Sequence, residues 1–171
     1  MLKTIEAARE LVKIRDKLPR ILALDLMSNL GYCCRADDGS LHYGTETFLS
    51  KQRSSDGLRY LKFRNWLKQM HETIRPSIVF FEEVRGFPPK NCGRDSRVYY
   101  AFESHLLSFC ESARLDHQGV TPGTIKKFIA GHGNASKKDV MLAVQTQGYR
   151  PGDDNQSDAI ALLLYAESII L

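Results

Sequence analysis

The sequence predicts one α/β domain in which a mixed β-sheet is covered by helices. The chain has 171 residues, of which 43% are hydrophobic, enough to bury a core without disulfides or a structural metal. Three short strand-like segments open the main part of the chain, and strand-like and helical segments then alternate, which is typical of α/β proteins. The sequence contains no uninterrupted run of 18 apolar residues, so a membrane-spanning helix is not expected.

The first element is an added amphipathic helix. Apolar residues recur at helical spacing over residues 4–18, and Pro19 stops the run. We therefore divide the chain into a helical extension, residues 1–19, and a main domain, residues 20–171.

Three strands are expected next. Residues 20–27 form a short apolar run that indicates a buried strand. Strand-like segments follow at 30–37 and 41–48, and Asp38-Gly39 between them is a common hairpin turn pair. The sheet is expected to begin with antiparallel strands.

Helices and parallel strands alternate after the hairpin. An amphipathic helix is expected over 57–75 and a second helix over 97–113. Between them, residues 77–84 are the most apolar strand segment of the chain and are expected at the centre of the sheet. A last strand is expected near 115–120.

Helices are expected to form the C-terminal part. A short helix covers about 123–130. Ser136-Lys137-Lys138-Asp139 has the pattern of a capping box that opens a further helix, which Gly148 closes. A final helix is expected over about 155–169.

The cysteines and the net charge limit the class of protein. The four cysteines form no C-x-x-C pair, and no Cys/His cluster has zinc spacing, which indicates reduced thiols in a cytoplasmic protein. The net charge of +4 is weak support for a polyanionic partner. We expect neither a membrane nor a small-molecule cofactor as a partner.

Three carboxylates stand where apolar residues are expected. Asp25 interrupts the first strand, Glu82 ends the strand at 77–84, and Asp158 lies in the apolar final helix. An unpaired carboxylate there costs several kcal/mol, so each must be paired, protonated or bound to a cation. Taken singly, such an acid can also be a loop residue at a strand end or a helix cap. Glu83 is expected to point to the opposite face of the strand from Glu82, so we do not assign it to the candidate site.

These acids are expected to converge. If the two strands run parallel and adjacent, Asp25 and Glu82 emerge at the same carboxyl end of the sheet, where ligands bind in open α/β sheets. Asp154 and Asp158 share one helix face. Four carboxylates around one point repel one another unless a cation neutralises them, and oxygen ligands favour Mg²⁺ or Mn²⁺. Two such ions can activate water and stabilise the leaving oxygen in phosphodiester hydrolysis.

Basic residues surround the acids unevenly. Around residues 124–138, a glycine-rich loop and helix starts favour contact with phosphate. The basic residues of 51–75 are explained equally well as a solvated helix face. The residues predicted to contact a phosphate backbone are Arg85, Lys90, Arg94, Arg97, Lys127, His132 and Lys138.

Four segments resemble the RuvC-like Holliday-junction resolvases, especially the compact versions of phages and prophages. They read ILALDL, VFFEEV, TIKKFIAGHGNASKKDV and GYRPGDDNQSDAIALLL, and the resemblance covers about residues 20–168. It implies a ribonuclease H-like fold, a homodimer, and metal-dependent nicking of four-way DNA junctions at two symmetric sites.

The resemblance also implies roles for single residues. The family's first-strand aspartate, central-strand glutamate and final-helix aspartate match Asp25, Glu82 and Asp158. Lys126 and Lys137 match lysines that lie near the scissile phosphate. The family's other helix acid falls on Asn155, so Asp154 is expected to take its place.

Two alternatives remain open at the level of sequence. One is a nuclease for another branched or hybrid nucleic acid, and the other is a catalytically inactive module that binds branched DNA. The candidate dimer surface is the apolar face of the helix at 97–113, with Val98, Phe102, Leu106 and Phe109.

Overall fold

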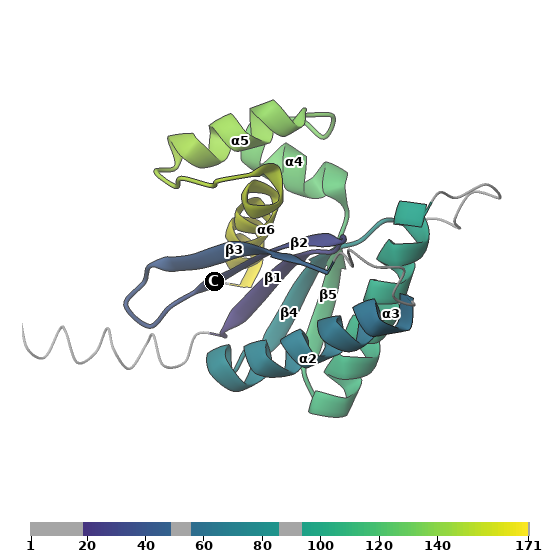
Figure 1. Cartoon of the computed structure of the whole chain (residues 1–171). Helices are drawn as coiled ribbons and strands as arrows, with labels where there is room; N and C mark the ends of the chain where they lie inside the picture. The colour runs from purple at the N-terminus through teal and green to yellow at the C-terminus, as the bar shows by residue number, and fades with distance from the viewer. Residues whose placement is uncertain (1–18, 49–55, 86–93, 171) are drawn as a thin grey trace, which may run out of the picture.

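The computed structural model describes residues 19–48, 56–85 and 94–170, which form a five-stranded sheet with helices on both faces (Figure 1). The strand order is β3-β2-β1-β4-β5, with β1 antiparallel to β2, β2 antiparallel to β3, and the pairs β1–β4 and β4–β5 parallel. This confirms the predicted mixed sheet. The strands are β1 (Ile21–Asp25), β2 (Asn29–Arg35), β3 (Leu41–Thr47), β4 (Ile78–Glu82) and β5 (Asp116–Val120).

One expectation about the sheet was wrong. The middle strand is β1, whereas β4 lies between β1 and the edge strand β5. Helices cover both faces of the sheet, so any strand with a neighbour on each side is buried on both faces and reads as an apolar run. Hydrophobicity therefore shows that β4 is internal, but it does not fix its place in the order.

The hairpin between β2 and β3 forms as predicted. Gly39 has a φ of 89°, in the left-handed region, and its N–H donates to the carbonyl of Ala36 at 3.0 Å. The Asp38 carboxylate accepts from the N–H of Ser40 at 2.8 Å. Glycine meets the backbone requirement of this turn without steric cost.

The helices divide between the two faces of the sheet. Figure 1 shows α2 and α3 on one side, with α4, α5 and α6 on the other. The helix α3 begins three residues before the predicted start, and the predicted helix at 4–18 falls outside the described residues. The bounds are α2 (Asp56–Ile74), α3 (Arg94–Ala113), α4 (Pro122–Ala130), α5 (Lys137–Thr146) and α6 (Asp154–Ile170).

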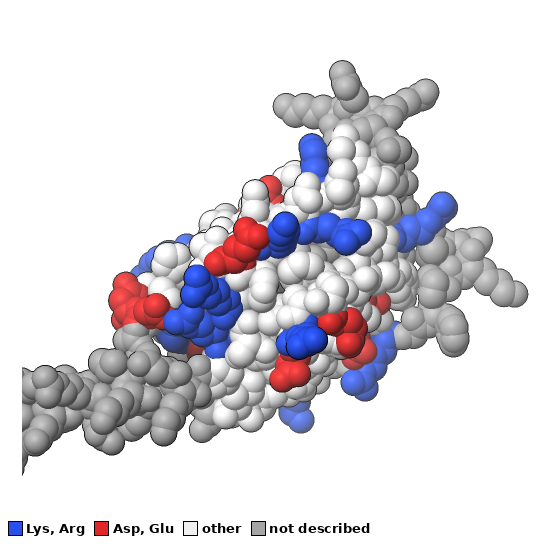
Figure 2. Space-filling view, turned by 90° about the horizontal axis from the view of Figure 1, so that it is seen from below, with Lys and Arg blue, Asp and Glu red and all other residues white. Residues whose placement is uncertain are grey.

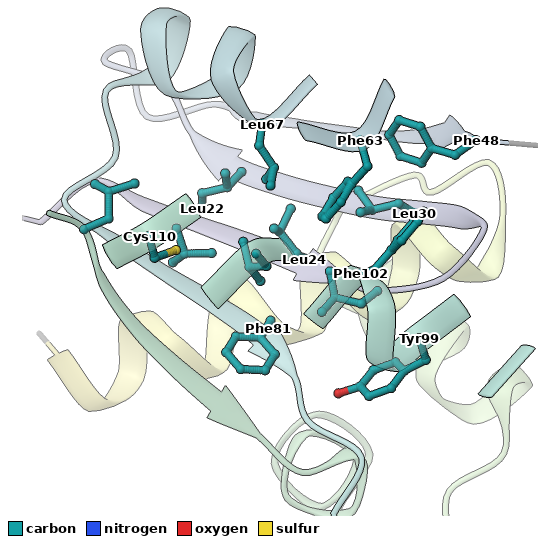
Figure 3. Packing of buried hydrophobic residues seen from close by; sticks show 14 of the residues in the cluster. Leu22, Leu24, Leu30, Phe48, Phe63, Leu67, Phe81, Tyr99, Phe102 and Cys110 are labelled. Carbon is teal, nitrogen blue, oxygen red and sulfur yellow. The ribbon is translucent and has the colours of Figure 1, made fainter. Parts of the chain in front are cut away.

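Alternation along the strands creates two separate cores. In β1, Leu22 and Leu24 pack toward α2 and α3, whereas Ile21 and Ala23 pack toward α6. The first core is rich in aromatic rings (Figure 3). The next position that faces α6 in the same alternation is Asp25.

The predicted dimer surface is part of this first core. Val98 is 2% exposed, and Phe102 and Leu106 are fully buried. Phe102 stacks on Phe63 with ring centroids 4.4 Å apart. The helical periodicity was identified correctly, but the apolar face covers the sheet of its own chain and is not free to pair with a second copy.

Two further expectations concern thiols and membranes. Cys33, Cys34 and Cys110 are buried and free, in agreement with the predicted reduced thiols. Within 19–48, 56–85 and 94–170, none of the helices has the length and apolar character that crossing a bilayer requires.

Candidate active site

Asp25 and Glu82 reach the same end of the sheet because β1 and β4 are parallel neighbours. Leu24 of β1 lies beside Phe81 of β4, and the next residue of each strand is one of the two acids. Val79 and Phe81 belong to the core under α2 and α3, so Glu82 faces α6, as Asp25 does. The convergence expected from parallel pairing is therefore present in the backbone.

The other two acids come from the start of α6. Asp154 is the first residue of this helix and Asp158 lies one turn later. The helix packs along β1 and β2, with Ala159, Ile160 and Leu163 fully buried in the second core. This packing holds the first turns of α6 above the carboxyl end of β1.

The charge environment of Asp25 shows that the four acids influence one another. Burial raises the pKa of this carboxyl well above its usual range, and repulsion from Glu82 and Asp158 raises the pKa further. Asp154 acts in the same direction, and Lys137 opposes it. A carboxylate in this position is costly for the fold unless a cation compensates it.

Glu82 and Asp158 are perturbed in the same direction. Burial, together with repulsion from Asp158, raises the pKa of Glu82 to about 7, against the opposing effect of Lys126 and Lys137. Burial raises the pKa of Asp158 to about 6, again with both lysines opposing. The two lysines therefore lie close enough to act on the acids but do not balance their charge.

Lys137 is held at this site by the start of α5. The predicted capping box is present: the Ser136 N–H donates to Asp139 Oδ2 at 2.8 Å, and the Asp139 N–H donates to Ser136 Oγ at 3.3 Å. Lys137 is then the first residue of α5, and its ammonium forms an ion pair with the Asp154 carboxylate. This hydrogen bond lowers the pKa of Asp154 and raises the pKa of Lys137.

The four carboxylates have the chemistry to bind a divalent cation, but their oxygens are not arranged around a common position. Among the described residues, no group of three or more His, Cys, Asp or Glu side chains is arranged to hold a metal ion. Mutually repelling carboxylates keep apart, and Asp154 is turned to Lys137. A donor set made only of carboxylates suits Mg²⁺ or Mn²⁺. The predicted coordination by Asp25, Glu82, Asp154 and Asp158 stays a prediction.

The residues predicted to contact phosphate lie on several elements and differ in exposure. Lys126 is half-buried on α4 and acts on Glu82 and Asp158, whereas Lys127, His132 and Lys138 are exposed. Arg85 is exposed and pairs with Glu83 at 2.9 Å. Arg97 is exposed on the first turn of α3; the side chain of Arg94, and Lys90 as a whole, lie outside the described part.

The basic side chains on the side of α2 and α3 do not form a continuous band. Figure 2 looks on to the side where α2 and α3 lie and shows Lys and Arg in separate groups, with acidic side chains beside several of them. Lys62, Arg64 and Lys68 are exposed on α2. The described surface on this side therefore favours the interpretation as a solvated helix face.

Sequence reasoning missed a hydrogen-bonded clamp next to Glu82. The Tyr99 side chain of α3 lies at the margin of the first core (Figure 3). Its hydroxyl accepts from the Val84 N–H at 2.9 Å and lies 2.9 Å from the Glu82 carbonyl oxygen and 3.2 Å from a Glu103 carboxylate oxygen. It therefore fixes the backbone on both sides of the residue after Glu82. In the sequence, Tyr99 is one of several aromatic residues on an apolar helix face, which does not indicate that its hydroxyl bonds to the backbone after β4.

Sequence reasoning also missed the cap of α6. The Asp153 carboxylate accepts from the Gln156 N–H at 2.8 Å, and Gln156 Oε1 accepts from the Gly152 N–H at 2.8 Å. The pattern Asp-x-x-Gln was a readable signal for this cap. Asp153, and not Asp154, therefore caps α6, and the Asp154 carboxylate pairs with Lys137.

Comparison with known proteins identifies the fold. No family model matches the chain. The structure of RuvC from Thermus thermophilus matches with a TM-score of 0.65 and 22% identity, covering 88% of this chain and 97% of that one. The same protein in complex with a Holliday junction substrate gives 0.67 and 20%, covering 89% and 97%. The yeast mitochondrial Holliday junction resolvase Ydc2 gives 0.57 and 17%, covering 90% and 83%. The chain has the ribonuclease H-like fold of these proteins, as predicted.

Proposed function

We propose that this chain is a divalent-metal-dependent endonuclease that resolves four-way DNA junctions by hydrolysing phosphodiester bonds. One observation carries the proposal: half-buried acids from β1, β4 and α6 repel one another at the carboxyl end of the sheet. Their raised pKa values mean that they destabilise the fold as charged groups, so packing does not explain them. Binding of a catalytic cation would explain why the acids are kept at these positions.

Two ions of Mg²⁺, with Mn²⁺ as a substitute, are held in this proposal by Asp25, Glu82, Asp154 and Asp158. When bound, they supply activation of water and neutralisation of charge at the phosphate. Lys126 and Lys137 stand beside the acids and would contact the scissile phosphate as point charges. Lys137 would exchange its ion pair with Asp154 for this contact.

The substrate class is supported by the structural likeness. The RuvC structure that matches 89% of this chain holds a Holliday junction substrate. In this chain, the exposed Lys127, His132 and Lys138 lie on α4, α5 and the loop that joins them, the same segment that carries Lys126 and Lys137. Basic groups there would bind the DNA backbone and position a phosphate at the acids.

A homodimer belongs to the proposal because a junction needs two paired cuts. Two sites related by a two-fold axis match the pseudo-symmetry of a four-way junction. Sedimentation velocity of the full chain is expected to show a dimer at micromolar concentration, and a monomer at every concentration would contradict this part of the proposal.

Cleavage by the purified full chain tests the proposal. With Mg²⁺, the chain is expected to cut a labelled four-way junction in preference to a flap, a linear duplex and an RNA–DNA hybrid. The variant Asp25→Asn is expected to lose cleavage by about 10²-fold or more, but to keep junction binding. The matched control is Asp116→Asn, the same chemical change at an exposed residue at the amino end of β5.

Each other outcome has a defined meaning. Preferred cutting of the flap or the hybrid would assign the site to another substrate. Junction binding without cleavage in any divalent ion would indicate an inactive binding module. Cleavage by Asp25→Asn at the wild-type rate would show that the carboxylate cluster is not the catalytic centre.

A further inference from the structure

A row of three residues crosses the sheet beneath the start of α6. Asp25 of β1 pairs with Gly31 of β2, and Gly31 pairs with Thr45 of β3. Paired residues in neighbouring strands face the same side, so this row faces α6 together with the Asp25 carboxyl. Only Asp25 belongs to the proposed catalytic set. The other two positions contact the helix that carries Asp154 and Asp158.

Gly31 lets the helix backbone lie directly on the strand. A Cβ atom at this position would stand 2.0 Å from the Asn155 carbonyl oxygen and 2.6 Å from its carbonyl carbon. Neither atom belongs to a side chain that could turn away, so any other residue at position 31 displaces the first turn of α6. The distance between Asp25 and this turn is therefore set by the absence of a side chain.

Thr45 fixes the same turn by a hydrogen bond. Its Oγ1 lies 2.9 Å and 2.7 Å from the two carboxylate oxygens of Asp153 and donates to that carboxylate. Asp153 in turn accepts from the Gln156 N–H, which caps the helix. The edge strand is thus joined through one partly buried hydroxyl to the residue that immediately precedes Asp154.

We propose that Thr45, acting through the cap of Asp153, and Gly31 are positioning residues that set where α6 presents Asp154 and Asp158 to Asp25. The hydroxyl controls the rotation of the first turn, and the bare glycine backbone controls its distance from the sheet. This inference rests on the proposed function and adds residues on β2 and β3 to a site whose acids come from β1, β4 and α6.

The test compares Thr45→Val, which keeps the side-chain shape but cannot donate, with Thr45→Ser, which keeps the hydroxyl. The matched control is Thr47→Val, two residues along the same strand, where the lost hydroxyl bonds only to Asn29 at 3.1 Å among the described contacts. Mn²⁺ affinity is measured on the full chain without DNA by calorimetry, well below the unfolding temperature. Junction binding in EDTA and junction cleavage in Mg²⁺ are measured in parallel.

Thr45→Val is expected to weaken Mn²⁺ binding by about 10- to 100-fold and to slow cleavage. Thr45→Ser is expected to restore most of the affinity, and junction binding in EDTA is expected to stay unchanged in the three threonine variants. Gly31→Ala is expected to be more severe. Because that change can also unfold the protein, the threonine variants decide whether the positioning role holds.

The outcomes separate this inference from the proposed function. Mn²⁺ affinity equal to that of the wild type in Thr45→Val, or an equal loss in Thr47→Val, would overturn the positioning role. If Thr45→Val weakens Mn²⁺ binding but the wild type cuts no junction, the positioning role holds and the substrate assignment fails. A wild-type chain that binds no Mn²⁺ would overturn both.

Discussion

At the scale of single residues, the ionised Glu82 carboxylate lowers the free energy of unfolding. Burial raises the pKa of its carboxyl to about 7, whereas an unfolded chain keeps a glutamate near its ordinary pKa of about 4.3. Between these values the folded state holds a proton that the unfolded state has released. The free energy of unfolding therefore falls as the pH rises through this window, and the full destabilisation is present above about pH 7.

This sign gives a prediction about stability. Without divalent ions at pH 8, Glu82→Gln is expected to unfold with a free energy roughly 1–3 kcal/mol higher than the wild type. At pH 5 the difference is expected to be much smaller, because each pH unit between the two pKa values adds at most about 1.4 kcal/mol and pH 5 lies near the lower end of the window. Urea unfolding of both proteins at the two pH values measures it, with the exposed Glu72→Gln of α2 as the control.

Saturating Mg²⁺ is expected to reduce the advantage of Glu82→Gln, since a cation that binds the folded state stabilises the wild type more. If the variant were equally stable or less stable at pH 8, the burial of an uncompensated charge at Glu82 would be refuted.

The elements of this fold were predictable where a local signal marks them. The hairpin turn at Gly39, the capping box at Ser136 and the closing glycine at Gly148 are each written in a few adjacent residues, and all three are present. The place of β4 in the sheet was not predictable, because strand order depends on pairing between segments far apart in the chain.

The candidate site divides in the same way. Asp25 and Glu82 were found because an acid inside an apolar strand is visible in one segment. Thr45 and Tyr99 were missed because the partner of Thr45 and the backbone partners of Tyr99 lie at least 15 residues away in the sequence. Gly31 could have been recognised as a place of close backbone approach, but the sequence around it does not predict that Asn155 is the residue it contacts.

The turn at Gly39 gives a prediction at the scale of one element. Its φ of 89° is strained for any residue with a Cβ atom, although a Cβ added at this position would have no other atom within 4 Å. Gly39→Ala is expected to cost about 1–2 kcal/mol, which lowers the melting temperature by about 2–8 °C for a domain of this size. Scanning calorimetry measures the change.

The control is Gly123→Ala, in the first turn of α4, where the φ is not left-handed and the nearest atom to an added Cβ is 3.9 Å away. Its melting temperature is expected to stay the same or to rise slightly, because alanine favours helix more than glycine. An equal loss in both variants would show that the cost at position 39 does not come from the backbone conformation.

At the scale of the whole molecule, the four acids of the candidate site and the exposed lysines lie on different elements. The acids lie between the sheet and α6, and exposed lysines lie on α4, α5 and the helix α2 of the opposite face. A net charge of +4 does not tell which of these lysines a DNA backbone would contact. The position of the acids does, because a scissile phosphate must reach them, and this favours Lys127 on α4 over Lys62 on α2.

Salt dependence tests this choice. Affinity for a four-way junction is measured at several salt concentrations with Mg²⁺, in the Asp25→Asn background so that the DNA stays uncut. Lys127→Ala is expected to reduce the slope of log affinity against log salt by about one, the effect of one lost phosphate contact. Lys62→Ala is expected to leave the slope unchanged, because α2 lies on the far side of the sheet from α4. The opposite result would place the DNA on the side of α2, where its phosphates could not reach the acids between the sheet and α6, and the carboxylate cluster would then need another explanation.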